Sequence, residues 1–131
     1  MPSTTTQFYH SVKQLISEGI PPQFPNHQTH DFLPHITLTS GIDKSLYGNE
    51  PQIWLDSLNV PVTSAARPLV LKLEALEAGE PFVKKFTARL SKLPEILKLA
   101  EACRAEAVTG GNFDKAREWA QEQYLPHMSL L

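Results

Sequence analysis

A hexapeptide that occurs twice constrains this chain more than any other feature of its sequence. Leu-Pro-His-Ile-Thr-Leu at residues 33–38, the first motif, recurs as Leu-Pro-His-Met-Ser-Leu at residues 125–130, the second motif. Apolar and polar residues alternate in both copies, as in a strand whose residues i and i+2 point to one face. Each motif therefore predicts a strand with a histidine and a hydroxyl on the same face. These pairs are His35 with Thr37 and His127 with Ser129.

Two histidines with two hydroxyls suit the chemistry of a phosphate. A hydroxyl can donate a hydrogen bond to a phosphate oxygen. Histidine has an ordinary pKa of about 6.5, so two histidines at one phosphate can hold opposite protonation states near neutral pH. Opening a cyclic phosphodiester with water needs one group that accepts a proton and one that donates it. We therefore predict that His35 and His127 form an acid/base pair at a bound phosphate, a pair that could hydrolyse a small cyclic phosphate.

The composition predicts one soluble domain over residues 1–131. The chain is 41% hydrophobic and 20% charged, which is ordinary for a globular protein. We expect no membrane span and an intracellular location, because no apolar run approaches the roughly 20 residues of a span and residues 1–6 do not resemble a signal peptide. A net charge of -2 argues against a long nucleic acid as partner, and nothing implies an obligate protein partner.

The order of elements predicts an α+β domain with helices packed on a mixed or antiparallel sheet. Hydrophobic spacing and turn residues indicate helices over 8–20, 51–58, 93–103 and 113–120, and strands over 34–39, 69–75, 82–90 and 124–131. Gly79 to Pro81 are expected to form a turn. Ser91 and Asn112 are expected to cap the last two helices, and the single Cys103 to be a buried core thiol.

Paired His-x-Thr/Ser motifs about ninety residues apart resemble those of the two-histidine phosphoesterase superfamily. The residues around them are similar to the fungal and plant cyclic nucleotide phosphodiesterases. That resemblance implies a bilobal fold with pseudo-two-fold symmetry, in which each lobe supplies one motif strand to a central cleft. It also implies that Thr37 and Ser129 bind the substrate phosphate, and that neither a metal nor another cofactor takes part.

The same resemblance implies the substrates. The family opens ADP-ribose 1″,2″-cyclic phosphate to the 1″-phosphate and converts nucleoside 2′,3′-cyclic phosphates to 2′-phosphates, downstream of transfer RNA splicing. Fungal relatives also suggest an association with the Golgi. Family members usually have an apolar strand before the first helix and continue well past the second motif. This chain starts at Met1 and stops at Leu131, so we expect an incomplete domain that lacks terminal strands.

Further residues near the motifs have two readings each. Tyr124, three residues before His127, either packs at a core position or lines the cleft. Lys84, Lys85 and Arg89 could steer a phosphate, although basic residues on a strand are more often a solvated face that guards an edge.

A metal site is disfavoured. His27, His30 and His35 are spaced by three and five residues in a proline-rich stretch, which matches no common zinc pattern.

Thr39 shares the predicted strand face of His35, but it is left outside the catalytic set.

Two other functions stay open from the sequence. One is a catalytically silent module that binds a nucleotide or an RNA end without turnover. The other is an RNA 2′,3′-cyclic phosphodiesterase of the same superfamily, related to the ligase-like group.

Overall fold

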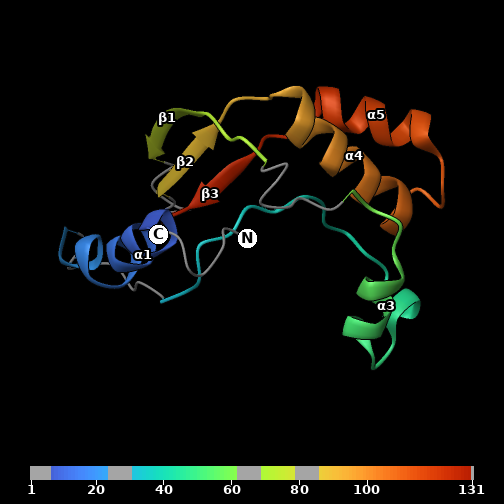
Figure 1. The fold of residues 1–131 in the computed structure, drawn as a ribbon, viewed down its shortest axis with the longest axis horizontal. Coiled ribbons are helices and arrows are strands. Elements are labelled where there is room, and N and C mark those ends of the chain that lie inside the picture. The colour runs from blue at the N-terminus through green and yellow to red at the C-terminus, as the bar shows by residue number, and fades with distance from the viewer. Residues whose placement is uncertain (1–6, 24–30, 62–68, 79–85, 131) are drawn as a thin grey trace. The chain divides into compact units, whose positions relative to one another are not determined.

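The computed structural model describes residues 7–23, 31–61, 69–78 and 86–130. These residues form a mixed α+β fold with a small antiparallel sheet (Figure 1), as the order of elements predicted. No helix in these ranges is both long and apolar enough to cross a membrane.

The chain divides into two compact units, and the motifs lie where it crosses between them. The first unit comprises Met1–Thr37, Leu73–Ser91 and His127–Leu131, and the second comprises Leu38–Lys72 and Lys92–Pro126. Two of the four crossings fall directly after Thr37 and directly before His127. All four histidine and hydroxyl residues of the motifs therefore belong to the first unit.

The first unit is built on a three-stranded antiparallel sheet. Its strands, in spatial order, are β1 (Leu73–Ala78), β2 (Phe86–Leu90) and β3 (His127–Ser129). Met128 of β3 lies opposite Ala88 of β2 and also forms an isolated antiparallel bridge with Ile36. A strand residue has one neighbour on each side, so the chain at Ile36 runs along the edge of β3 that β2 leaves open. The first motif thus lies beside the second.

A helical segment covers the apolar face of this sheet. It comprises α1 (Gln7–Gln14), a π-helical turn (Leu15–Gly19) and a short 3₁₀ turn (Pro21–Gln23). Val12, Ile16 and Ile20 recur every four residues and so share one face of this segment. They form a buried cluster with Ala88, Met128 and Leu130, against which Phe32, Ile36 and Phe86 pack. Burial of this face leaves the opposite face of the motif strands available for polar side chains.

The second unit is helical. Its helices are α2 (Lys44–Tyr47), α3 (Pro51–Ser57), α4 (Pro94–Ala107) and α5 (Phe113–Glu122). The last two lie side by side (Figure 1). Small side chains allow two helices to pack closely, and Ala100, Ala105 and Ala116 of this pair are fully buried. Asn112 caps α5 as predicted, because its Oδ1 accepts a hydrogen bond of 3.1 Å from the Lys115 backbone N–H.

The strands differ from the sequence-based prediction in length and position. The first motif is reduced to the single bridge at Ile36, since the preceding Pro34 has no N–H to donate to a ladder. The strand predicted at 69–75 is β1 at Leu73–Ala78, and a bulge between Leu73 and Ala75 breaks the expected alternation. The turn at Gly79 to Pro81 and the start of the next predicted strand lie outside the described residues.

Two predictions about the second unit were wrong in detail. Ser91 does not cap α4, which starts at Pro94 with Leu93 as its N-cap residue and no side-chain cap. Proline suits the first helical turn because its φ is already helical and its missing N–H has no partner there. Cys103 is half-buried rather than fully buried, although burial still raises the pKa of its thiol. The short helix α2 was not predicted at all.

Candidate active site

The alternation predicted for the two motifs is present in both. Pro34 and Pro126 are fully buried, whereas His35 and His127, which follow them directly, are exposed. Ile36 is half-buried and Met128 is buried in the core. Each motif therefore turns its proline and the residue after its histidine inward, and presents the histidine on the surface of the first unit.

The bridge between Ile36 and Met128 fixes how the predicted site residues face each other. In an antiparallel pair centred on this bridge, His35 lies across from Ser129 and Thr37 lies across from His127. Residues directly opposite have Cβ atoms about 5 Å apart, and diagonal neighbours such as His35 and His127 are separated by roughly 7–8 Å. By this geometry all four residues share one face, the polar face of the sheet, with the histidines at opposite corners.

A hydrogen bond to the backbone fixes the tautomer of His35. Its Nδ1 is 2.8 Å from the carbonyl oxygen of Leu33. A carbonyl only accepts, so Nδ1 carries a proton and Nε2 is the nitrogen that can exchange one with a substrate. The ring of Phe32 meets the imidazole edge-on, with centroids 6.3 Å apart.

The segment before the first motif is tied to α1. Lys13 Nζ forms an ion pair of 2.6 Å with Asp31 Oδ1 and a hydrogen bond of 3.5 Å with the carbonyl oxygen of Phe32. The hydrogen bond from Lys13 lowers the pKa of the Asp31 carboxyl. These contacts hold the chain four residues before His35 against the helix that covers the core.

A second row of polar side chains borders the site. In the register of β2 with β3, Arg89 lies opposite His127 and Thr87 lies opposite Ser129. The Arg89 guanidinium forms ion pairs with Glu77 (Nη1 to Oε1, 2.8 Å) and Glu74 (Nε to Oε2, 3.4 Å). The Arg89 side chain is 42% exposed, which fits the prediction of a solvated strand face. Its position opposite His127 also places it at the border of the candidate site.

Thr87 was missed by the sequence reasoning. It alternates with the buried Ala88, which shows that it points to the polar face, but only the pairing of β2 with β3 places it beside Ser129. Lys84 and Lys85 lie outside the described residues.

Tyr124 packs within the second unit. Its side chain is 6% exposed, and its ring lies against Trp119 with centroids 5.3 Å apart and planes at 33°. Burial raises the pKa of its phenol to about 12. Its assignment to the cleft stays a prediction.

His27 and His30, two of the three histidines considered for a metal site, lie outside the described residues. Among the residues that are described, no three histidine, cysteine or acidic side chains gather as metal ligands.

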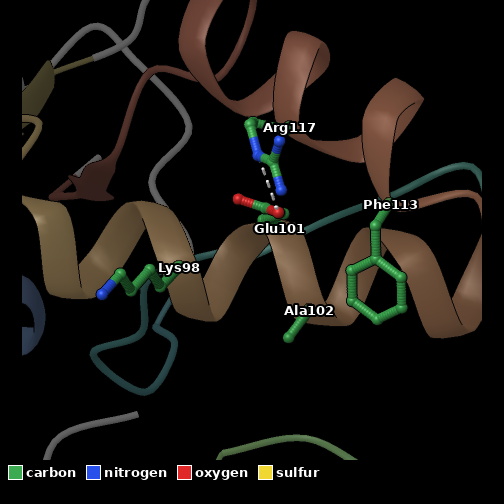
Figure 2. A pocket seen from close by; sticks show the side chains of 5 residues that line it. All are labelled: Lys98, Glu101, Ala102, Phe113 and Arg117. Carbon is green, nitrogen blue, oxygen red and sulfur yellow. Dashed lines mark ion pairs between the residues drawn. The ribbon is translucent and has the colours of Figure 1, made fainter.

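A cavity of about 320 Å³ lies between α4 and α5, lined by Lys98, Glu101, Ala102, Phe113 and Arg117. Figure 2 shows Arg117 reaching toward Glu101, with a shortest distance of 3.4 Å from Nε to Oε1. None of the predicted site residues lines this cavity, and nothing in it matches the chemistry of the motifs.

Comparisons with known proteins agree with the motifs. A family model described as cyclic phosphodiesterase-like protein matches residues 1–131. A 2′,3′-cyclic-nucleotide 3′-phosphodiesterase of Phaeosphaeria nodorum is 39% identical over 102 residues, which cover 78% of this chain and 51% of the relative. The protein of the same name from Neurospora crassa is 30% identical over 145 aligned positions, covering all of this chain and 67% of the relative.

A third relative of that name, from Yarrowia lipolytica, is 27% identical over 62% of its length. The chain thus spans about half to two thirds of the curated relatives it matches. No solved structure is significantly similar to it. On the match of the family model to its whole length, this chain belongs to the cyclic phosphodiesterase-like family.

Proposed function

We propose that this chain hydrolyses 2′,3′-cyclic nucleotides by breaking the bond to the 3′ oxygen, which gives nucleoside 2′-phosphates. The observation that carries the proposal is the antiparallel bridge between Ile36 and Met128. From this bridge, strand geometry puts His35, Thr37, His127 and Ser129 on one polar face. The names of the curated relatives support this reaction class.

The reaction needs two proton transfers, and the site offers one histidine for each. Water attacks phosphorus opposite the 3′ oxygen and loses a proton to the histidine that is neutral. The bond from phosphorus to the 3′ oxygen breaks, and the protonated histidine gives its proton to that oxygen. His35 can take either role through Nε2, because Nδ1 is already a donor to Leu33. Solvent then restores the two protonation states.

Thr37 and Ser129 hold the phosphate in this proposal. Each lies directly across from the histidine of the other motif. Their hydroxyls can donate to the non-bridging oxygens, which stabilises the charge that grows there during attack. Phosphate contacts from both motifs would fix phosphorus between the two imidazoles.

Finer features rest on the resemblance and belong to the same proposal. They are hydrolysis of ADP-ribose 1″,2″-cyclic phosphate, action after transfer RNA splicing, a bilobal pseudo-symmetric arrangement of the lobes, and an intracellular location with Golgi association.

The test is turnover of a nucleoside 2′,3′-cyclic phosphate by the wild-type chain and by His35→Ala, His127→Ala and His10→Ala. His10 is an exposed histidine of α1 and serves as the matched control. Loss of either motif histidine should lower kcat by about 10²- to 10⁴-fold, whereas loss of His10 should leave it unchanged. The 2′-phosphate product is identified by chromatography, with EDTA present in a parallel series.

Three outcomes would count against the proposal. Full activity in either motif variant would remove the acid/base pair. A folded wild-type chain that binds a nucleoside 2′-phosphate but turns nothing over would favour the catalytically silent module. Hydrolysis of an RNA 2′,3′-cyclic end in preference to the mononucleotide would favour the ligase-like alternative.

A further inference from the structure

The chain that leaves the first motif and the chain that leads into the second both lie in the second unit. Two of the crossings fall after Thr37 and before His127, so Thr39, Ser40 and Tyr124 belong to the second unit. Contacts that hold these three residues therefore restrict the positions at which the chain leaves the first motif and enters the second. Contacts inside the second unit can therefore influence the spacing of the histidines through the chain alone.

Arg104 holds the chain after the first motif. It lies in the last turn of α4. Its Nη1 donates to Thr39 Oγ1 at 3.3 Å and to the carbonyl oxygen of Ser40 at 3.1 Å. These acceptors are separated from Arg104 by more than sixty residues in sequence, and they lie only two and three residues beyond Thr37.

The same guanidinium lies over an aromatic pair that precedes the second motif. Its carbon is 4.5 Å from the centre of the Trp119 ring, a distance at which a cation is attracted to the ring face. Trp119 in turn stacks on the buried Tyr124. The Tyr124 backbone N–H also donates to the Trp119 carbonyl oxygen at 3.0 Å, and Tyr124 is three residues before His127.

Arg104 is half-buried, which distinguishes it from an exposed surface arginine. Its Nε is buried and finds no hydrogen-bond partner among the described residues, an arrangement that is costly unless the surrounding contacts hold the group in place. Arg117, on the neighbouring helix, is 55% exposed and pairs with the carboxylates of Glu101 and Asp114. Arg117 thus keeps its charge at the surface, and its ion pairs involve neither Thr39, Ser40 nor Trp119, which makes it a matched control.

We propose that Arg104 is a positioning residue for the two-histidine site. It binds the chain that leaves His35 and Thr37 and, through Trp119 and Tyr124, the chain that leads to His127 and Ser129. The inference rests on the proposed function, since it assigns Arg104 to the geometry of that reaction. A displacement of about 1 Å between reacting groups can cost on the order of 10²-fold in rate.

The first test compares kcat and KM for a nucleoside 2′,3′-cyclic phosphate in Arg104→Gln, Arg104→Lys and Arg117→Gln. Arg104→Gln should lower kcat by about 10- to 100-fold with little change in KM, because phosphate-binding groups remain while their alignment is lost. Arg104→Lys keeps a cation and a donor but not the flat stack on Trp119, so it should restore part of kcat. Arg117→Gln should behave as wild type.

A double-mutant cycle isolates the contact with the first motif. Thr39→Val keeps the shape of the side chain but removes the acceptor for Arg104 Nη1. If the two residues act together, the double variant Thr39→Val with Arg104→Gln should be no slower than Arg104→Gln alone. Additive losses would show that Thr39 and Arg104 act independently and would contradict the proposal.

A second readout does not depend on turnover. In NMR spectra of the wild-type chain with labelled histidine, Arg104→Gln should shift the imidazole signals of His35 and His127 and leave that of His10 in place. An inactive wild type would refute the proposed function, yet these shifts would still test Arg104. Unmoved signals, or a kcat within about threefold of the Arg117→Gln value, would overturn the proposal. If Arg104→Gln does not fold, Arg104→Lys and Thr39→Val carry the same comparisons.

Discussion

Met128 should be the side chain on which the first unit depends most. It is 3% exposed, it belongs to the buried cluster, and it pairs with Ala88 on one side and Ile36 on the other. Met128→Ala removes a buried side chain at the point where the two motifs meet. Replacing a buried methionine by alanine typically lowers the free energy of unfolding by about 2–5 kcal/mol.

This loss is large against the stability of a small domain. Domains are usually stable by about 5–15 kcal/mol. For a chain of this length each 1 kcal/mol corresponds to a change in Tm of roughly 3–5 °C, so Met128→Ala should lower Tm by at least about 6 °C. Met128→Leu conserves volume and should cost less than about 1.5 kcal/mol.

The assays are urea denaturation and thermal denaturation, each monitored by circular dichroism, with Leu76→Ala as the control. Leu76 lies in β1 of the same sheet but is 60% exposed, so its truncation should change stability by no more than about 0.5 kcal/mol. The reasoning fails if Met128→Ala and Leu76→Ala shift the midpoint equally. A retained Tm in Met128→Ala would mean that the bridge does not join the motifs through a packed core.

Three further predictions concern separate parts of the molecule. Thr37→Ala with Ser129→Ala should weaken both substrate binding and kcat but leave residual turnover, and normal kinetics in the double variant would remove both residues from the site. Asn112→Ala should lower the free energy of unfolding by about 0.5–2 kcal/mol in denaturant titration, whereas Asn112→Asp keeps an acceptor for the Lys115 N–H and should cost less. Burial raises the pKa of Tyr124 from 10.0 to about 12, so the unfolded chain loses this proton first and stability should fall as the pH rises from about 10 to about 12; Tyr124→Phe should flatten that part of a stability-against-pH curve.

The local part of the site was predictable because it depends on the two-residue period of a strand. That period alone placed His35 and His127 on the surface and Met128 in the core. The pairing of the two motifs as neighbouring strands was not predictable, because the bridge between Ile36 and Met128 joins residues far apart in sequence. Thr87 was missed for the same reason, because its neighbour is set by strand pairing.

Element boundaries were predicted less well than element types. Alternation over residues 69–75 suggested a strand, but the observed β1 starts at Leu73 and carries a bulge, which no local pattern indicated. At the start of α4, the capping preference of Ser91 competes with Pro94 three residues later, and Pro94 gives the stronger signal for a first helical turn. Such positions depend on tertiary pairing and on competition between nearby signals.

The bridge at Ile36 and Met128 also bears on which bond of a cyclic phosphate is broken. An antiparallel pair has a local two-fold axis perpendicular to the sheet, and rotation about it exchanges His35 with His127 and Thr37 with Ser129. A ring phosphate bound among these four groups would meet nearly equivalent surroundings in either of two orientations. Regioselectivity under the proposed reaction must then come from groups that the axis does not repeat. Arg89, which borders only the β3 side, is one such group.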